Sequence, residues 1–431
     1  MVATAQGTGE HASAARQAVV AAVIGNVLEW YDFSVYAFVA AILAKQFFPG
    51  GSEVTGYLAT FAAFGLGFLA RPLGGIVIGR IGDTRGRKAA LVLTILLMAV
   101  GTTLIGLIPS YATIGVLAPA LLVLARLMQG FSAGGEWGGS TAFIVEWAPA
   151  RRRGYYGSFQ QASVATGLLL GSGIAALCAS FLDAATMEAW GWRVPFLLGA
   201  VLGPVGMYLR RNIDETPAYR RVSATPAPAV TASATSPVGL AALAFGFTIH
   251  WTVIFYIFLS YMPTFTAKYL KLARADALWS NTIGVLVLVV AIPLFGLLSD
   301  RIGRKPLLLT SCIAFIVLPY PILSHMLGAP DFASTVAMQI LFGLCIALYS
   351  GAGPAAISEI FPTRIRSTWM TTGYALSVAI FGGFAPFIAT WLIGPDPGRP
   401  IAPVFYVMAA SVITTLVLLF GIKETAHGDL A

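Results

Sequence analysis

The sequence predicts an all-α membrane protein of twelve transmembrane helices, arranged as two similar six-helix bundles. Three observations predict this fold class: a very apolar composition, apolar runs that recur along the whole chain, and two motifs that each occur twice at nearly one spacing. Of the 431 residues, 58% are hydrophobic and 10% are charged, against about 25% charged residues in soluble domains. This composition leaves too little polar surface for a water-soluble fold and indicates a protein embedded in lipid.

Twelve apolar runs are each long enough to cross a bilayer, because a helix needs roughly 20 mostly apolar residues to span about 30 Å of hydrocarbon. Helices are expected because an open sheet edge cannot satisfy its hydrogen bonds in lipid. The chain is predicted to form an N-terminal bundle at 1–210, a cytoplasmic linker at 211–237 that is rich in Ala, Thr, Ser and Pro, and a C-terminal bundle at 238–431. The predicted spans are 18–44, 56–79, 89–109, 114–147, 156–181, 193–210, 238–265, 279–299, 306–327, 333–360, 367–393 and 401–422.

The distribution of positive charge predicts the orientation of the chain. If the N-terminus is cytoplasmic, 18 of the 26 Lys and Arg residues fall in cytoplasmic segments, 6 in outer segments and 2 within spans, as the positive-inside rule expects. The polar segment before the first span lacks the features of a removable signal. The sequence therefore predicts a multi-pass protein of the bacterial cytoplasmic (inner) membrane with both termini in the cytoplasm. Topology accounts for the net charge of +8, so no nucleic-acid partner is expected.

Two motifs repeat between the halves. Segment 79–88 has a counterpart at 296–305, and segment 146–153 has one at 359–366, so both motifs recur at nearly the same offset, close to half the chain. Six helices per repeat is an even number, so both halves enter the membrane in the same direction. This predicts a parallel pseudo-twofold repeat, as in the two halves of a major facilitator.

The charged residues of these motifs are predicted to form a conformational gate at the cytoplasmic face. An aspartate in such a loop can face the N-terminus of a neighbouring helix, or pair with an arginine, in one conformation only. The alternative is a set of basic loops that only determine topology. The predicted gate residues are Asp83, Arg87, Asp300, Arg304, Glu146 and Glu359.

Ionisable residues inside the spans predict a transport pathway. A cationic side chain at the bilayer centre costs roughly 2.5–3.5 kcal/mol on insertion scales, so Arg126 is expected to face a polar cavity with a carboxylate partner or an anionic substrate. The alternative is an arginine that snorkels near the outer end of its span. Asp32 and Glu29 are three residues apart and share a helix face. We predict that Asp32, Glu29 and Arg126 couple transport to a proton, with a static ion pair between spans 1 and 4 as the alternative.

Further polar and aromatic residues in the spans are candidate substrate ligands, although His250 could equally be hydrogen-bonded to a neighbouring helix and the tyrosines could be packing residues. Arg71 lies toward the cytoplasmic end of its span and is interpreted as structural. The sequence contains no metal-spaced His/Cys cluster, nucleophile elbow or phosphate loop, so no cofactor, no metal and no enzymatic activity are predicted. The predicted substrate-binding residues are Arg126, Asn26, Tyr31, Gln129, Gln160, His250, Tyr256 and Tyr374.

Several segments resemble the metabolite:proton symporter family of the major facilitator superfamily, and the resemblance covers nearly the whole chain. This family includes proton symporters for citrate, α-ketoglutarate and shikimate, and for proline or glycine betaine. The resemblance implies alternating access and proton coupling, and Asp32 and Arg126 match the coupling pair of related sugar–proton symporters. The segments that carry it are 26–33, 71–75, 126–136, 190–195, 209–216 and 380–383.

Within that family the carboxylate transporters resemble the chain more than the betaine type does, on the basis of Arg126, segment 154–161 and segment 379–383. The sequence therefore favours a monomeric symporter of a small organic carboxylate, such as citrate or a dicarboxylate, together with H⁺. A proton symporter of a zwitterionic osmolyte, proline or glycine betaine, is the alternative. A second alternative is a receptor or sensor that binds a solute without transporting it.

Overall fold

The computed structural model describes residues 23–85, 87–199, 203, 236–395, 398–426 and 428, and these residues form helices joined by short connections. Eight of the helices are long and apolar enough to cross a membrane, and the bent pair Val23–Phe38 and Ala40–Phe47 raises the number to nine. Two shorter apolar helices, Val92–Leu107 and Leu117–Ser132, match two more predicted spans. The prediction of an all-helical membrane fold is confirmed. Most of predicted span 193–210 and of the predicted linker 211–237 lies outside the described residues.

The helices of the first half follow the predicted spans closely. The chain bends by 64° between the helix Val23–Phe38 and α2, and two predicted spans each consist of two consecutive helices, α3 with α4 and α7 with α8. The elements are Val23–Phe38, α2 (Ala40–Phe47), α3 (Glu53–Leu69), α4 (Arg71–Arg85), α5 (Arg87–Leu107), α6 (Tyr111–Ile114), α7 (Leu117–Ser132), α8 (Glu136–Trp147), α9 (Arg153–Phe181) and α10 (Ala184–Ala189).

The second half is interrupted at different places, because predicted spans 8 and 10 are the continuous helices Arg274–Ile302 and Phe332–Glu359. Short π-helical segments, Tyr256–Tyr261 and Val378–Gly382, interrupt predicted spans 7 and 11. The remaining elements are α13 (Pro237–Phe255), α14 (Met262–Tyr269), α15 (Arg274–Ile302), α16 (Arg304–Val317), α17 (Pro319–Gly328), α18 (Phe332–Glu359), α19 (Thr363–Ser377), α20 (Ala385–Ile393) and α21 (Pro403–Leu416), with a last π-helical segment at Val417–Gly421.

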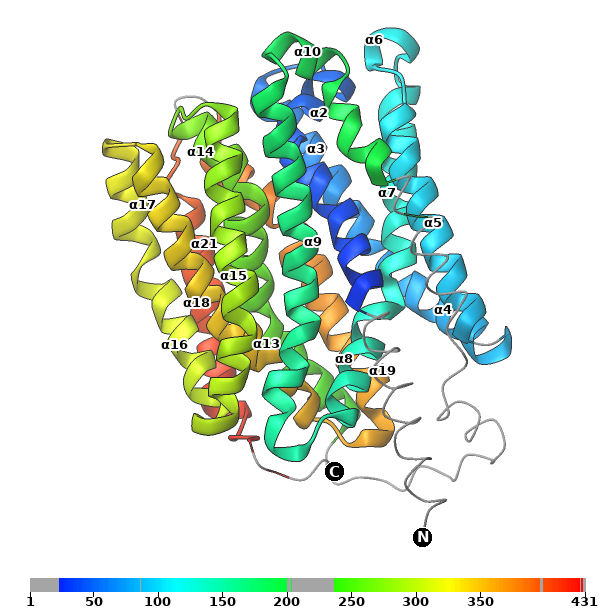
Figure 1. Ribbon diagram of the computed structural model, residues 1–431, viewed down its shortest axis with the longest axis vertical. Coiled ribbons are helices and arrows are strands. Elements are labelled where there is room, and N and C mark those ends of the chain that lie inside the picture. Colours follow the sequence, from blue (N-terminus) through cyan, green and yellow to red (C-terminus); the bar gives the residue numbers. More distant parts are fainter. Residues whose placement is uncertain are drawn as a thin grey trace, which may run out of the picture.

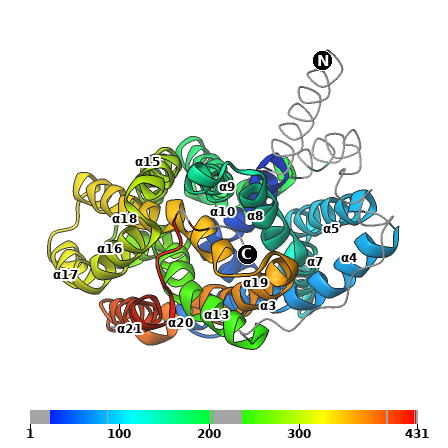
Figure 2. The same ribbon diagram turned by 90° about the horizontal axis from the view of Figure 1, so that it is seen from below.

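The helices run side by side, with α6, α10 and α14 at one end of the bundle and the α8–α9 and α15–α16 connections at the other (Figure 1). We call the second end the basic end, because its connections carry the arginine-rich segments 151–153, 301–305 and 364–366. Viewed along the helices, α15, α16, α18 and α21 lie on one side of the molecule and α3, α4, α5 and α7 on the other (Figure 2). This separation places a central seam between the two halves.

Helices α9 and α15, one from each half, line part of this seam. They approach closely at the basic end because both carry glycine there. A Cβ on Gly154 would lie 2.6 Å from the carbonyl oxygen of Gly296 and 2.3 Å from Oγ of Ser299. At the opposite end the halves meet again, where Lys268 pairs with Glu53 at 3.4 Å. Contacts between the halves therefore lie at both ends of the seam.

Candidate functional site

A pocket lies on the seam between the two halves, and we call it the central pocket. The helix Val23–Phe38 and α9 supply its first-half wall, while α13, the π-helical segment after it and α19 supply its second-half wall. Helix interruptions of this kind often mark functional sites. The lining residues are Trp30, Gln161, Val164, Thr248, Trp251, Thr252, Phe255, Tyr256 and Tyr374.

The walls of the central pocket are largely aromatic. The ring centroids of Trp30 and Tyr256 are 6.3 Å apart, and those of Trp251 and Tyr374 are also 6.3 Å apart with the planes at 74°. The close approach of span 11 depends on Gly382, where a Cβ would lie 2.0 Å from Oγ1 of Thr252. Aromatic faces carry partial negative charge and attract cations, and quaternary ammonium groups in particular.

The central pocket also contains polar atoms that lack partners. Oε1 of Gln161, Oγ1 of Thr252 and the hydroxyl of Tyr256 are buried and make no hydrogen bond to any residue that the structure describes. Buried polar groups are nearly always hydrogen-bonded, to protein, ligand or water. An aromatic pocket with unpartnered polar atoms is therefore suited to a small solute that has both a cationic and a polar part.

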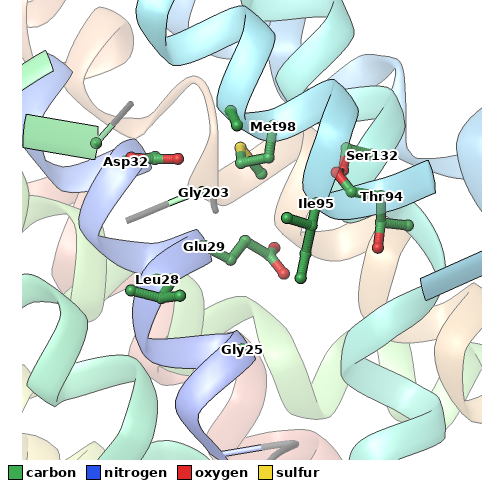
Figure 3. Close-up of a pocket in the computed structure, with 11 residues that line it drawn as sticks. Gly25, Leu28, Glu29, Asp32, Thr94, Ile95, Met98, Ser132 and Gly203 are labelled. Atoms are coloured by element: carbon green, nitrogen blue, oxygen red, sulfur yellow. The ribbon is translucent and has the colours of Figure 1, made fainter. Parts of the chain in front are cut away.

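A second pocket lies inside the first half, and we call it the first-half pocket. Its walls come from the helix Val23–Phe38, α5 and α7. Glu29 and Asp32 both extend from their helix toward α5, which carries Thr94, Ile95 and Met98 (Figure 3). Trp30, on the same helix, lines the central pocket instead. The two carboxylates and the aromatic pocket are thus separated by the thickness of one helix. The residues of the first-half pocket are Gly25, Leu28, Glu29, Asp32, Thr94, Ile95, Met98, Ala99, Ser132, Gly199 and Gly203.

Arg126 is linked to Asp32 through other side chains and not by a direct ion pair. Nη1 of Arg126 donates to Oε1 of Gln129 at 2.7 Å, and Nε2 of Gln129 donates to Oγ1 of Thr102 at 2.7 Å. The Thr102 hydroxyl in turn lies close to the Asp32 carboxylate. The guanidinium of Arg126 has 0% exposure and lies within 5 Å of the ring centroids of Phe33, Tyr36 and Phe64. Sequence reasoning could not foresee the bridging role of Gln129 and Thr102.

Arg71, which the sequence analysis interprets as structural, contacts a carboxylate and several aromatic rings. Its Nη2 lies 3.9 Å from Oε1 of Glu29, and its guanidinium carbon lies 4.7 Å from the ring centroid of Phe33 and 4.4 Å from that of Phe68. Only 4% of Arg71 is exposed. It therefore belongs to a buried charge cluster beside the pockets.

Of the eight residues predicted to bind substrate, Tyr256 and Tyr374 line the central pocket. Five of the others make side-chain contacts inside one half. Asn26 donates to Oγ of Ser163 at 2.7 Å, Tyr31 donates to the carbonyl of Pro195 at 2.6 Å, and His250 hydrogen-bonds through its ring nitrogens to Ser411 and Ser311 at 2.8 and 3.2 Å. Gln160 is buried outside the pocket lining, with both side-chain polar atoms unpartnered among the described residues.

Sequence reasoning missed the indoles of Trp30 and Trp251. One signal was available, because Trp30 lies in the first predicted span and Trp251 in the seventh. These two spans correspond to each other in the repeat, and the two tryptophans are separated by nearly the same offset as the repeated motifs. Matching aromatic residues at related positions would have indicated a site shared by the two halves.

At the basic end, the predicted gate residue Asp300 sits at the N-terminus of α9. Its carboxylate accepts hydrogen bonds from the backbone N–H groups of Gly154 and Tyr155, both at 2.8 Å, and from Nη1 of Arg304 at 2.7 Å. The positive end of a helix dipole favours a carboxylate at this position. Asp300 and the backbone that it binds belong to different halves.

The other predicted gate residues make two further ion pairs. Arg366 of the second half pairs with Glu146 of the first half at 2.7 Å, while Arg304 pairs with Glu359 inside the second half at 3.3 Å. The side chains of Asp83 and Arg87 lie outside the described residues.

The fold and this pair of pockets define a transporter of the major facilitator type. The family model described as "Major Facilitator Superfamily" matches residues 254–430, and the model described as "Sugar (and other) transporter" matches residues 18–229. The chain belongs to the major facilitator superfamily, and it is a multi-pass membrane transporter and not an enzyme.

Among its relatives, the chain is similar to the glycine betaine/proline/ectoine/pipecolic acid transporter OusA of Dickeya dadantii (strain 3937), with 36% identity over 96% of this chain and 84% of the relative. It is 35% identical to the proline/betaine transporter of Escherichia coli (strain K12), over 96% and 85% of the two chains. It is 37% identical to a putative proline/betaine transporter of Staphylococcus aureus (strain COL), over 97% and 91%.

Solved structures of the xylose transporter XylE from E. coli have the same fold. The partially occluded inward-open conformation matches with a TM-score of 0.79 at 17% identity, covering 96% of this chain and 99% of that chain. The proton:xylose symporter XylE bound to 6-bromo-6-deoxy-D-glucose matches with the same TM-score and identity, covering 97% and 98%.

These relatives correct the substrate preference derived from the sequence. They support the zwitterion alternative, proline or betaine transport, over the carboxylate interpretation. The structure gives a physical reason for the error. Gly154, which begins the segment used for that interpretation, packs at the basic end, and Arg126 lies within the first half outside the central pocket. Gly154 and Arg126 therefore give no information about the central pocket, although Gln161, at the end of the same segment, does line it.

Proposed function

We propose that this chain is a proton-coupled symporter of a small zwitterion, such as glycine betaine or proline, in the bacterial cytoplasmic membrane. The observation that carries the proposal is the aromatic central pocket on the seam, with Trp30 and Tyr256 facing each other from opposite halves. Such walls bind an onium group, and each cation–π contact contributes about 0.5–2 kcal/mol depending on desolvation. The names of the relatives support the same class of substrate.

The coupling proton is proposed to reach Asp32 and Glu29 through the first-half pocket, which those carboxylates line. Arg126 acts on Asp32 through Gln129 and Thr102, so a movement that breaks this chain of contacts changes the charge that Asp32 experiences. Ionisable groups inside membrane spans commonly form proton relays. Substrate and proton would thus act on opposite faces of the same helix.

Alternating access is proposed to occur by rocking of the two halves about the central pocket. The contacts of Asp300 with α9 and of Arg366 with Glu146 would hold the basic end closed and would break when it opens. The repeat-related Asp83 and Arg87 are proposed to act in the same way in the first half. The basic end and both termini are proposed to face the cytoplasm, and the transporter is proposed to act as a monomer.

The proposal is tested by uptake into proteoliposomes that contain the purified protein. With an inward proton gradient, radiolabelled glycine betaine or proline should accumulate above its external concentration, and a protonophore should abolish the accumulation. Citrate and α-ketoglutarate should not accumulate. Accumulation of a carboxylate without either zwitterion would contradict the proposal, and binding without any flux would indicate a receptor.

A further inference from the structure

The buried guanidinium of Arg71, beside the central pocket, has hydrogen-bond donors that lack acceptors in the part of the chain that the structure describes. Nε and Nη2 of Arg71 are buried and donate no hydrogen bond to any described residue. The 3.9 Å between Nη2 and Oε1 of Glu29 makes an ion pair but is too long for a hydrogen bond. Buried donors without acceptors are costly, and an arginine carries five donors in a planar fork that matches a carboxylate. This position is therefore suited to an additional anionic group.

Arg71 lies directly behind the aromatic wall of the central pocket. Its guanidinium carbon is 5.7 Å from the ring centroid of Trp30 and 4.4 Å from that of Phe68. Both of these rings contact Tyr256, with centroids 6.3 and 5.3 Å apart. Arg71 also lies within electrostatic range of Tyr256 and of Tyr374, which line the pocket. A positive charge thus adjoins a surface that itself attracts positive charge.

Arg126, the other buried arginine nearby, also has Nε and Nη2 without a partner among the described residues, and neither arginine lines the central pocket. What distinguishes the two is their surroundings. One of its nitrogens is bound to Gln129 at 2.7 Å, and the rings of Phe33, Tyr36 and Phe64 surround its guanidinium. The ring of Phe33 contacts both guanidinium groups, at 4.7 Å for Arg71 and 4.9 Å for Arg126. Arg71 alone of the two also contacts Trp30, which lines the central pocket.

We propose that Arg71 binds the carboxylate of the transported zwitterion, while Trp30, Trp251 and Tyr256 hold its ammonium group. The proposal rests on the function proposed above and adds a recognition rule to it. A substrate must carry an onium group and a carboxylate a few bonds apart to reach both sites. The substrate carboxylate competes with Glu29 for the guanidinium, and the long Arg71–Glu29 separation favours this exchange. Arg71 is thereby a residue that determines specificity.

The test compares glycine betaine with choline, which has the same trimethylammonium group but a hydroxyl in place of the carboxylate. Binding to the full-length purified protein is measured by isothermal titration calorimetry. The wild-type chain should bind glycine betaine at least about 30-fold more tightly than choline, as expected when a buried charge pair loses one partner. Arg71→Gln should weaken glycine betaine binding by about 30-fold or more and change choline binding by less than about threefold.

Two further variants make the test decisive. Arg399→Gln removes an exposed arginine at the surface and should retain wild-type affinities. Arg71→Lys keeps the positive charge but loses the planar set of donors that matches a carboxylate, so it should lower the betaine-to-choline preference by at least about threefold. This variant replaces Arg71→Gln in the test if Arg71→Gln does not fold.

Each alternative outcome has a defined meaning. Equal loss of both ligands in Arg71→Gln would show a structural role and overturn the assignment, as would an unchanged preference in both variants. Equal affinity of the wild-type chain for betaine and choline would also overturn it, while leaving zwitterion transport intact. If the wild-type chain neither binds nor accumulates betaine or proline, the proposed function itself fails.

Discussion

Trp137 and Tyr374 stack face to face, with ring centroids 3.4 Å apart and planes 2° from parallel. Trp137 belongs to α8 of the first half and Tyr374 to α19 of the second half, so the stack crosses the seam. Tyr374 also lines the central pocket, and Trp137 contacts the pocket residue Trp251 at 6.1 Å. The stack is thus continuous with the pocket walls, and rocking the halves apart at this level must separate the two rings.

Replacing Trp137 with alanine should therefore favour opening of the basic end. Truncation of a buried tryptophan typically costs about 3–5 kcal/mol of stability. Here the substitution destabilises the conformation in which the two halves are in contact at the basic end. Spin labels at Arg151→Cys and Arg301→Cys, in a background without the three native cysteines, report the separation of the halves by double electron–electron resonance. The distance distribution should shift to longer values in Trp137→Ala.

A matched control is available for that experiment. Tyr320 and Phe405 also form an aromatic pair, with centroids 6.0 Å apart, but both belong to the second half and both are exposed. Phe405→Ala should leave the distance distribution unchanged. A Trp137→Ala distribution identical to that of the wild-type chain would contradict a role for the stack in closure.

Gly154 offers a second way to perturb closure. A Cβ there would lie 2.3 Å from Oγ of Ser299 and 2.4 Å from Nη1 of Arg304. Gly154→Ala should wedge α9 from α15 and cost about 1–3 kcal/mol in the closed conformation, which lowers uptake and lengthens the spin-label distances. Gly173→Ala is the control on the same helix, because its Cβ would meet only Thr282 Cγ2, at 3.9 Å. Equal effects of the two substitutions would contradict the expected wedge.

Asp32→Asn should separate proton coupling from substrate exchange. An amide side chain does not titrate near neutral pH, so accumulation of glycine betaine driven by a proton gradient should be lost. Counterflow exchange, which needs no net proton movement, should persist. Asp276→Asn, an exposed position in the first turn of α15, should retain both activities. Proton-driven accumulation that persists unchanged in Asp32→Asn would remove Asp32 from the coupling mechanism.

Glu424 ties the C-terminal segment to the basic end. Partial burial acts to raise the pKa of its carboxyl, but hydrogen bonds from the backbone N–H groups of Ala426, Arg304, Lys305 and Thr425 outweigh this effect and hold the pKa below the ordinary value of 4.5. Because the pKa is lowered in the docked state, the ionised carboxylate stabilises docking above pH 4.5, and this contribution is lost as the pH falls through the lowered pKa.

Hydrogen exchange of the backbone amides of Arg304 and Lys305, corrected for intrinsic rates, measures this docking. Protection should be constant from about pH 7 to about pH 5 and should fall below about pH 4. Glu424→Gln should lower the protection already at neutral pH, whereas Lys423→Gln, at an exposed position, should not. Protection that is independent of pH in the wild-type chain would contradict this account of the segment.

Much of the site could not be predicted from the sequence. Residue spacing along a helix shows which side chains share a face, but it does not show which other helix packs against that face. The sequence placed Asp32 and Glu29 on one face, and both do line the first-half pocket. It did not reveal that Gln129 and Thr102 stand between Arg126 and Asp32. His250 illustrates the same limit, because its serine partners lie 61 and 161 residues away along the chain.

The sequence by itself determined the membrane setting, the helical fold and the internal repeat. These three features follow from hydropathy and motif spacing, which can be read along the chain. Hydropathy acts directly, because an apolar segment of sufficient length is stable in the hydrocarbon layer only as a helix. Only the tertiary structure decided which buried charges meet, that Trp30 faces the central pocket while Glu29 beside it faces another, and that Arg71 adjoins the aromatic wall. Such pairings depend on how helices that are distant in sequence pack together. In lipid this packing is determined by shape and by the close contact of small residues, because hydrophobicity does not drive one helix against another there.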